Sequence, residues 1–254
     1  MAIETLGGAF GAATRKGRGH SFATPAVLAA TLVLLYLWVS TRQLDSMEAR
    51  VLSAAFIRDA ALTHLTVTAV SASLVVVIAI PLGVLLTRPF ARRLAPWVMA
   101  AANAGQAAPA LGVLVLLSIL FGIGTRIAVV TLVLHATLPV LRNTIAGIQQ
   151  VDTALLEAGR GMGMSRGQIL RRLELPLAVP VVMAGLRTTI VICVGIATVA
   201  TFINAGGLGD IIVAGIKLQR TSILVTGGVL TAVIALALDW LAGLAEKYVR
   251  PHGI

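Results

Sequence analysis

A glycine-rich segment is the first part of the sequence that could do chemistry, because backbone N–H groups in such loops can surround a phosphate group. It covers residues 157–176 and reads EAGRGMGMSRGQILRRLELP. A P-loop needs a lysine directly after its last glycine, and the chain contains no Gly-Lys pair. The dinucleotide fingerprint G-x-G-x-x-G would need a glycine where the sequence has Met164. We therefore expect no nucleotide site and no enzymatic activity in this chain.

Polar residues also interrupt the long apolar stretches of the sequence. Asn103, Gln106 and Pro109 fall within one of these stretches, and the spacing of the two amides places them on one face of a helix. Polar side chains are costly inside a bilayer, so they usually line a polar path or bond to a neighbouring helix. Both interpretations of these three residues stay open: a translocation path, or hydrogen bonds that hold helices together.

Two charged residues, Arg187 and Asp239, lie at similar depth in two further apolar stretches. We expect an ion pair between them; the alternative is that each side chain extends separately to the membrane surface. His135 is a lone histidine, for which a packing role is expected, and Cys193 is a small apolar filler. No histidine, cysteine or carboxylate group has the spacing of metal ligands, so no metal site is predicted.

The composition indicates what positions these residues. Hydrophobic residues make up 58% of the 254 residues, only 12% are charged, and the mean hydropathy is +0.97. A soluble domain has about 25% charged residues, and about 20 apolar residues are enough to cross a bilayer as a helix. We therefore predict an all-α membrane protein. Its six transmembrane helices are expected at about 24–41, 63–87, 95–121, 127–146, 178–203 and 222–245.

The formal net charge of +10 does not indicate nucleic-acid binding, because the basic residues are spread over several loops. With the N-terminus in the cytoplasm, the cytoplasmic loops carry most of the lysines and arginines, which favours an N-in, C-in orientation. The expected parts are a cytoplasmic tail (1–23), a first transmembrane helix with an outer loop (24–62), a membrane core (63–245) and a second cytoplasmic tail (246–254). The glycine-rich segment then falls in the longest cytoplasmic loop, 152–175.

This loop has the sequence signals of two short helices rather than of disorder. An apolar stripe at helical spacing predicts the first helix, with Asp152 as its N-cap. The stripe consists of Leu155, Ala158 and Met162. Ser165 and Gln168 match a capping box for a second helix over 168–174, and Pro176 is expected to end it.

The segment resembles the EAA loop in permease subunits of bacterial ATP-binding-cassette importers, whose pattern is E-A-A-x3-G-x9-I-x-L-P. The residues at the pattern's spacings include Glu157, Ala158, Gly159, Gly163, Leu173 and Pro176. Gly159 stands in place of the second alanine and Leu173 in place of isoleucine. The resemblance implies that the loop docks on a separate cytoplasmic ATP-binding subunit. That subunit would bind ATP and magnesium, and this chain would bind no cofactor.

Three other stretches are similar to the subgroup that imports osmoprotectants such as glycine betaine, choline and carnitine. They read HLTVTAVSASLVVVIAIPLGVLLTR (64–88), LPVLRNTIAGI (138–148) and FINAGGLGDIIVAGI (202–216). The resemblance implies a type I (MetI-like) permease fold in the bacterial inner membrane. It also implies a second permease copy or a paralogue, and a solute-binding protein outside. Gly206, Gly207 and Gly209 would then belong to an outer re-entrant segment near the pore, a possible outer gate, although a flexible turn is an equal alternative.

Other classes of protein remain to be tested. An ion-coupled secondary transporter usually has buried acids at mid-membrane, whereas the one acid in a predicted span is Asp239, near its end. An importer of a different small solute and a structural membrane subunit are further alternatives. Aromatic residues, which bind quaternary ammonium groups, are only 4% of the chain, so we expect the solute-binding protein to select the substrate.

Overall fold

The computed structural model describes residues 20–249, and every regular element within them is a helix. Most of the two predicted tails, 1–23 and 246–254, therefore lies outside the described residues. The chain divides into two compact units, one ending at Arg42 and the other starting at Gln43. Within residues 20–249, five helical segments are long and apolar enough to cross a bilayer, or six when one bent pair counts as a single span. The prediction of an all-α membrane protein is confirmed.

The first unit contains α1 (His20–Ser40). Its apolar part, Ala23–Ser40, matches the predicted first span and is long enough to cross the membrane. After the helix ends, the guanidinium group of Arg42 lies 4.9 Å from the ring centroid of Trp38. This cation–π contact places a charge and an aromatic ring at the helix end, where both suit a membrane surface.

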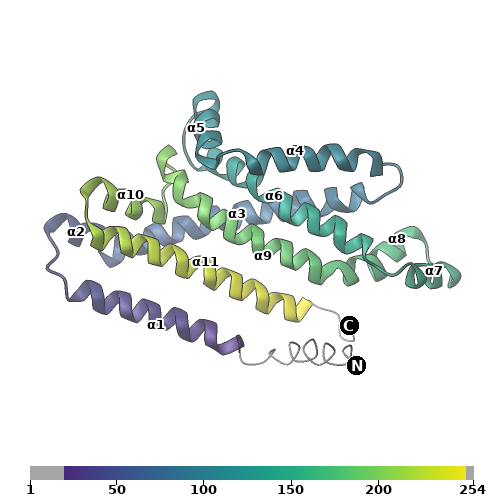
Figure 1. Cartoon of the computed structure of the whole chain (residues 1–254), viewed down its shortest axis with the longest axis horizontal. Coiled ribbons are helices and arrows are strands. Elements are labelled where there is room, and N and C mark those ends of the chain that lie inside the picture. The colour runs from purple at the N-terminus through teal and green to yellow at the C-terminus, as the bar shows by residue number, and fades with distance from the viewer. Residues whose placement is uncertain (1–19, 250–254) are drawn as a thin grey trace, which may run out of the picture. The chain divides into compact units, whose positions relative to one another are not determined.

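Four long helices of the second unit run side by side (Figure 1). They are α3 (Ala54–Leu86), α6 (Thr125–Gln149), α9 (Leu175–Val199) and α11 (Thr221–Val249). They correspond to the spans predicted at 63–87, 127–146, 178–203 and 222–245, although α3 begins earlier, at Ala54 behind the N-cap Ser53. The main apolar core lies between α3, α6 and α9. Its buried side chains include Val75, Ala79, Leu132, Val140 and Cys193.

Small residues allow α6 and α9 to approach closely. A β-carbon added to Gly185 of α9 would lie 2.8 Å from the carbonyl oxygen of Pro139 in α6, so no larger residue fits there. The same helix pair is joined by Thr189, whose hydroxyl donates to the carbonyl oxygen of Ala136 at 2.8 Å. Close packing and interhelical hydrogen bonds are what associate helices in a bilayer, where lipid removes the hydrophobic driving force.

The predicted span 95–121 is divided into two helices, and it counts as the sixth span when the bent pair is taken together. It consists of α4 (Ala95–Ala107) and α5 (Ala110–Phe121), which are bent by 96° relative to each other (Figure 1). The break lies at Pro109, which has no N–H to donate and which moves Ala108 to extended backbone with φ −65° and ψ 141°.

Short helices occupy the two ends of the four-helix bundle (Figure 1). One end carries α7 (Thr153–Gly161), α8 (Arg166–Ile169) and the π-helical turn η2 (Leu170–Glu174). The opposite end carries α2 (Ser46–Val51), the short 3₁₀ turn η3 (Ala200–Ile203) and α10 (Leu208–Leu218). A further 3₁₀ turn, η1 (Arg92–Leu94), precedes α4. We call residues 152–175 the α7–α8 loop.

Candidate functional site

The α7–α8 loop begins and turns through local hydrogen bonds. The side chain of Asp152 accepts from the backbone N–H of Ala154 at 2.8 Å, as the sequence predicts. At the other end of α7, Gly163 has φ +81°, and its N–H donates to the carbonyl oxygen of Arg160. The next N–H, that of Met164, donates to Gly159. This is the Schellman pattern, in which a glycine in the left-handed region ends a helix and turns the chain.

Gly159 allows α7 to pack closely against the segment that follows the turn at Gly163, and we call this turn the corner. It is buried, and a β-carbon added there would lie 3.0 Å from Cδ1 of Leu173 and 3.3 Å from the sulfur of Met164. The structure thus brings Gly159 of α7 into contact with Leu173 of η2, and both are predicted site residues. An alanine would require these two side-chain ends to move by a few tenths of an ångström.

The second part of the loop continues directly into the membrane helix. Ser165 and Gln168 form the predicted capping box at the start of α8. The prediction that Pro176 ends a separate helix is wrong, because α8, η2 and α9 follow one another without a break. In η2 the N–H of Leu175 donates to the carbonyl oxygen of Leu170. The wider π turn accommodates a proline in the first turn of α9.

The outer face of α7 is not covered by any other part of residues 20–249. Glu157 and Ala158 are exposed, and the apolar side chains of Leu155 and Met162 are 48% and 73% exposed. Within residues 20–249, no ion pair involves Glu157. A capped helix that presents an acid between apolar side chains is a surface on which another molecule can dock.

Sequence reasoning missed an ion pair at the base of this loop. Nη2 of Arg88, at the end of α3, lies 2.6 Å from Oε2 of Glu174, the last residue of η2. The two side chains are 24% and 11% exposed. The signal in the sequence was an acid between Leu173 and Leu175, next to a predicted span, because a charge in such a position needs a partner.

The amide of Asn103 makes a hydrogen bond within its own helix and another to a neighbouring helix. Its Nδ2 donates to the carbonyl oxygen of Met99 in its own helix, and its Oδ1 accepts from Arg142 of α6 at 3.2 Å. The residue is nevertheless exposed, as is Pro109, whereas Gln106 is half-buried. All three residues lie on the bent α4–α5 segment. Asn103 is held in place by its hydrogen bond to α6.

His135 connects α6 to the break in this segment. Its Nε2 lies 3.0 Å from the carbonyl oxygen of Ala108, next to the helix break, and its Nδ1 lies 2.9 Å from that of Thr131. The ring is buried, at 3% exposure. A neutral imidazole donates from one ring nitrogen, so one of these two carbonyl oxygens accepts its proton, and the ring packs α6 against the backbone at the break between α4 and α5.

Arg187 and Asp239 lie together in a bidentate ion pair between α9 and α11. Nε and Nη2 of Arg187 donate to the two carboxylate oxygens of Asp239 at 2.9 Å and 2.8 Å. Nη1 also lies 3.8 Å from Oε2 of Glu246, which is about two turns further along the same face of α11. Two parallel charge-assisted bonds fix the relative rotation of the two helices.

The glycines of the segment 204–210 permit close approach at the opposite end of the bundle. Gly206 and Gly207 have φ +75° and +98°, and a β-carbon added to Gly207 would lie 3.0 Å from Nδ1 of His64 in α3. Gly209 lies within α10 and is buried against α9. The hydroxyl of Thr201 donates to Asp210. The segment is thus an ordered turn that leads into a short helix.

A second polar cluster at this end fixes α2. Nη2 of Arg220 lies 2.7 Å from Oδ2 of Asp45, and the hydroxyl of Ser222 donates to Glu48. The Ser222 bond is the main reason why the pKa of the Glu48 carboxyl lies below its ordinary value of 4.5. The backbone N–H of Glu48 likewise lowers the pKa of Asp45 below 3.8.

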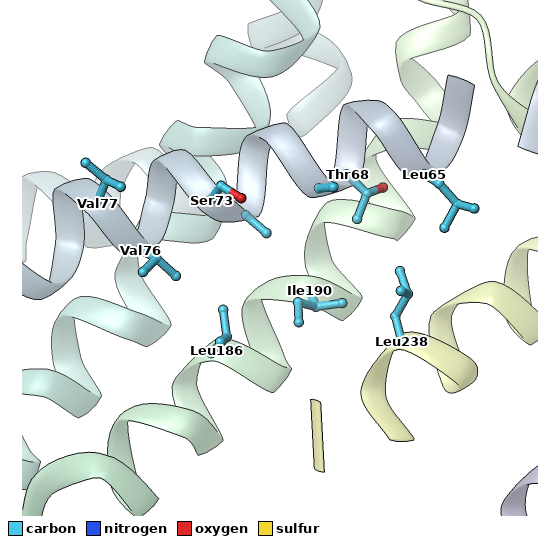
Figure 2. Close-up of a pocket in the computed structure, with 10 residues that line it drawn as sticks. Leu65, Thr68, Ser73, Val76, Val77, Leu186, Ile190 and Leu238 are labelled. Carbon is cyan, nitrogen blue, oxygen red and sulfur yellow. The ribbon is translucent and has the colours of Figure 1, made fainter. Parts of the chain in front are cut away.

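The groove between α3, α9 and α11 is apolar (Figure 2). It has a volume of about 500 Å³, and none of the predicted site residues lines it. Aliphatic side chains such as Leu186, Ile190 and Leu238 face it, with Thr68 and Ser73 as its hydroxyl groups. The groove offers neither a charge nor an aromatic ring to a cationic solute. Among residues 20–249, no three histidine, cysteine or carboxylate groups are placed to hold a metal ion.

Comparisons with known proteins agree with this arrangement. The family described as binding-protein-dependent transport system inner membrane component matches residues 79–251. The chain is 46% identical over 189 residues to the carnitine transport permease protein OpuCD of Listeria monocytogenes, which covers 74% of this chain and 84% of the relative. It is 44% identical over 176 residues to the glycine betaine/carnitine/choline transport system permease protein OpuCD of Bacillus subtilis, with 69% and 76% covered. A solved structure of the MetNI methionine ABC transporter in an inward-facing conformation superposes with a TM-score of 0.67 and 26% identity, over 77% of this chain and 96% of the other.

Proposed function

Because the chain belongs to the family of inner membrane components of binding-protein-dependent transport systems, we propose that it couples ATP hydrolysis by a partner subunit to the import of osmoprotectants. The single observation that carries this proposal is the α7–α8 loop. It is capped at both helices, turned by Gly163 and exposed at Glu157. The loop is built as a docking surface, while the chain has no P-loop of its own.

The mechanism follows from how the loop is attached. An ATP-binding subunit that binds α7 and moves it also moves η2, through the contact of Gly159 with Leu173. Since α8 and η2 continue into α9, this movement reaches a membrane helix without a flexible joint. ATP and magnesium belong to the partner in this scheme, and this chain holds no cofactor. The loop then lies in the cytoplasm, with N-in and C-in topology.

The substrate class rests on the relatives, whose names include carnitine, glycine betaine and choline. These solutes carry a quaternary ammonium group, which proteins bind with aromatic rings. The groove in Figure 2 has no aromatic lining residue. We therefore assign recognition of the cation to a solute-binding protein outside the membrane, and passage of the solute to this chain.

The translocation path is proposed to run along α4 and α5, beside a second copy of the chain or a paralogue. Asn103 and Pro109 are exposed in a segment of the membrane domain, and an exposed amide is costly against lipid. A second permease subunit on this face would enclose them in a polar path. The ordered turn at Gly206 and Gly207 is placed at the outer end of the path, as its outer gate.

The test is uptake into proteoliposomes that contain the chain, its ATP-binding subunit and its solute-binding protein. We expect uptake of radiolabelled glycine betaine, carnitine or choline that requires ATP and stops with vanadate. Uptake driven by an ion gradient without ATP would identify a secondary transporter and overturn the proposal. ATP-dependent uptake of a different small solute would keep the coupling mechanism and contradict the substrate class.

A further inference from the structure

The ion pair between Arg88 and Glu174 has no part in the function proposed above, yet it joins α3 to the base of the α7–α8 loop. We propose that this pair is a positioning element that makes α3 move together with the loop when the ATP-binding subunit moves it. The inference rests on the proposed function. It adds α3 to the helices that respond to ATP, beside α9, which the loop enters directly.

On one side of the pair, the arginine is fixed to the end of α3. Its Nε lies 3.2 Å from the carbonyl oxygen of Val84 and 3.1 Å from the hydroxyl oxygen of Thr87. Its Nη2 contacts the same hydroxyl at 2.9 Å and Glu174 at 2.6 Å. A guanidinium group held by three bonds to its own helix end acts as a rigid extension of α3, and its charge complements the helix dipole there.

On the other side, the acid is fixed in the loop. Glu174 is buried, it ends the π turn and it directly precedes α9 in a continuous helix, so its backbone cannot move independently of α9. A π turn directs the side chain at its end differently from an α-helical turn. In this chain that direction is toward Arg88, which is 86 residues away in the sequence.

A continuous line of contacts connects the exposed face of α7 to the pair. Glu157 is two residues from Gly159, Gly159 packs against Leu173, and Leu173 is the neighbour of Glu174 in η2. A displacement of α7 therefore acts on the carboxylate through packed atoms. Since an ion pair at 2.6 Å is short and mostly shielded from water, it resists separation when the loop moves.

The consequence is long-range because α3 is long. It has 33 residues, which is about 50 Å of helix, so it reaches from Arg88 to the opposite end of the bundle. There His64 contacts the turn at Gly207. A movement that starts at the pair is thus delivered to the segment 204–210, which the proposed function places at the outer gate.

The experiment uses the reconstituted complex with both partner subunits. It compares R88E, E174R, the double charge swap and the milder E174Q. Arg93 is an exposed arginine of the same connection between α3 and α4, so R93E is the matched control. Three quantities are measured for each: the amount of ATP-binding subunit that copurifies, the ATPase activity stimulated by the solute-binding protein, and the solute taken up per ATP hydrolysed.

We expect R88E and E174R to keep the ATP-binding subunit bound, because the face of α7 is unchanged, and to lower uptake per ATP about fivefold or more. E174Q keeps the shape and loses the charge, so a smaller loss of the same kind is expected. The double swap should recover at least about half of the wild-type coupling, and R93E should resemble the wild type.

Wild-type coupling in both single reversals overturns the inference. So does a loss of copurified ATP-binding subunit in proportion to uptake, since that result shows a structural role only. A double swap that is inserted normally but is no better than the single variants overturns it as well. If the wild-type complex itself shows no ATP-driven uptake, the proposed function fails, and this outcome is distinct from the others.

Discussion

The two short capped helices at opposite ends of the bundle, α2 and α7, start in the same way and differ in what surrounds them. Each begins with an aspartate that accepts from backbone N–H groups, Asp45 in one and Asp152 in the other. In α2 the charges then find partners in the chain, through Arg220 and Ser222 at the start of α11. In α7 the corresponding acid, Glu157, is exposed.

The difference shows that capping and docking are separate uses of the same local chemistry. The polar side chains of the α2 cluster find their partners within the chain, so we assign this cluster a structural role. The α7 helix is also capped at both ends, by Asp152 and by the turn at Gly163, but leaves its apolar side chains and its acid exposed. A helix that is stable in place and incomplete on its surface is suited to a partner, and the following experiments test that contrast.

The largest expected effect is that of E157K. Reversing the charge should lower uptake at least about 30-fold, because a charge at the centre of a docking surface then repels its partner. The melting temperature of the purified chain should not change, since Glu157 has no ion-pair partner among residues 20–249. Both are measured on the same preparation, by uptake in proteoliposomes and by thermal unfolding in detergent.

The matched variant at the other end is E48K, which should do the reverse. It should lower the melting temperature and leave binding of the ATP-binding subunit intact, because Glu48 bonds Ser222 within the chain. If E157K transports normally, or if both variants change the same quantity, the contrast between α2 and α7 is not valid.

A second test concerns Arg187, whose partners are both within the chain. R187M leaves Asp239 and Glu246 without their cation. We expect a loss of about 2 kcal/mol, less than for a fully buried pair because the side chains are partly exposed. This corresponds to a fall of about 4–8 °C in melting temperature for a chain of this size.

The reference for that variant is the exchange of the two charges, R187D with D239R. The exchanged chain should regain part of the lost stability, as expected for a pair whose two members interact directly. An exchanged chain that melts no higher than R187M would show that the two residues do not stabilise each other.

A third, smaller effect separates two glycines of the same loop. Gly163 has φ +81° and nothing within 4 Å of an added β-carbon, so G163A introduces backbone strain alone. It should destabilise the corner by about 1 kcal/mol. Gly161 also has open space but no positive φ, so G161A should stabilise α7 slightly.

Amide hydrogen exchange of α7 in the detergent-purified chain measures both variants without any partner. Faster exchange in G163A and slower exchange in G161A is the expected result. Equal exchange in the two variants would mean that the left-handed conformation does not define the corner.

The smallest expected effect is the pH dependence of the α2 cluster. The folded chain lowers the pKa of both Glu48 and Asp45, so their contribution is complete above about pH 4.5 and is lost as the pH falls through the lowered values. The wild type should therefore lose more melting temperature between about pH 6 and about pH 3 than E48Q does. Parallel losses in the two proteins would show that Glu48 does not contribute.

The parts of the loop that the sequence predicted depend on residues close together in the chain. Asp152 and Ser165 bond backbone groups within three positions of themselves, so their spacing alone was sufficient. The long apolar stretches predicted five of the long helices, α1, α3, α6, α9 and α11, for the same reason. In each case the relevant energy, a cap or a transfer into lipid, is a property of a short segment.

The parts that the sequence did not predict depend on contacts between distant segments. Nothing local gives the 96° angle at Pro109, because proline favours a break but the orientation of α5 is set by its packing on α6 and η3. Glu174 looked like the variable position of a motif until the structure placed it against Arg88. The π turn before Pro176 was also hidden, since its residues have ordinary helix propensity.

The π turn η2 affects how a change in the length of the α7–α8 loop would rotate α8 relative to α9. Each α-helical residue turns the chain by about 100°, and η2 holds one residue more than an α-helical turn would. The wider turn takes up that extra residue, so α8 and α9 keep nearly the phase of one continuous α-helix. A deletion of one residue within η2 would therefore leave an α-helical turn and keep the direction of Glu157, whereas a deletion in the regular helix of α9 just after it would carry α8 and the α7 packed on it round the axis by about 100°. The π turn is thus the place where a change in length is tolerated best.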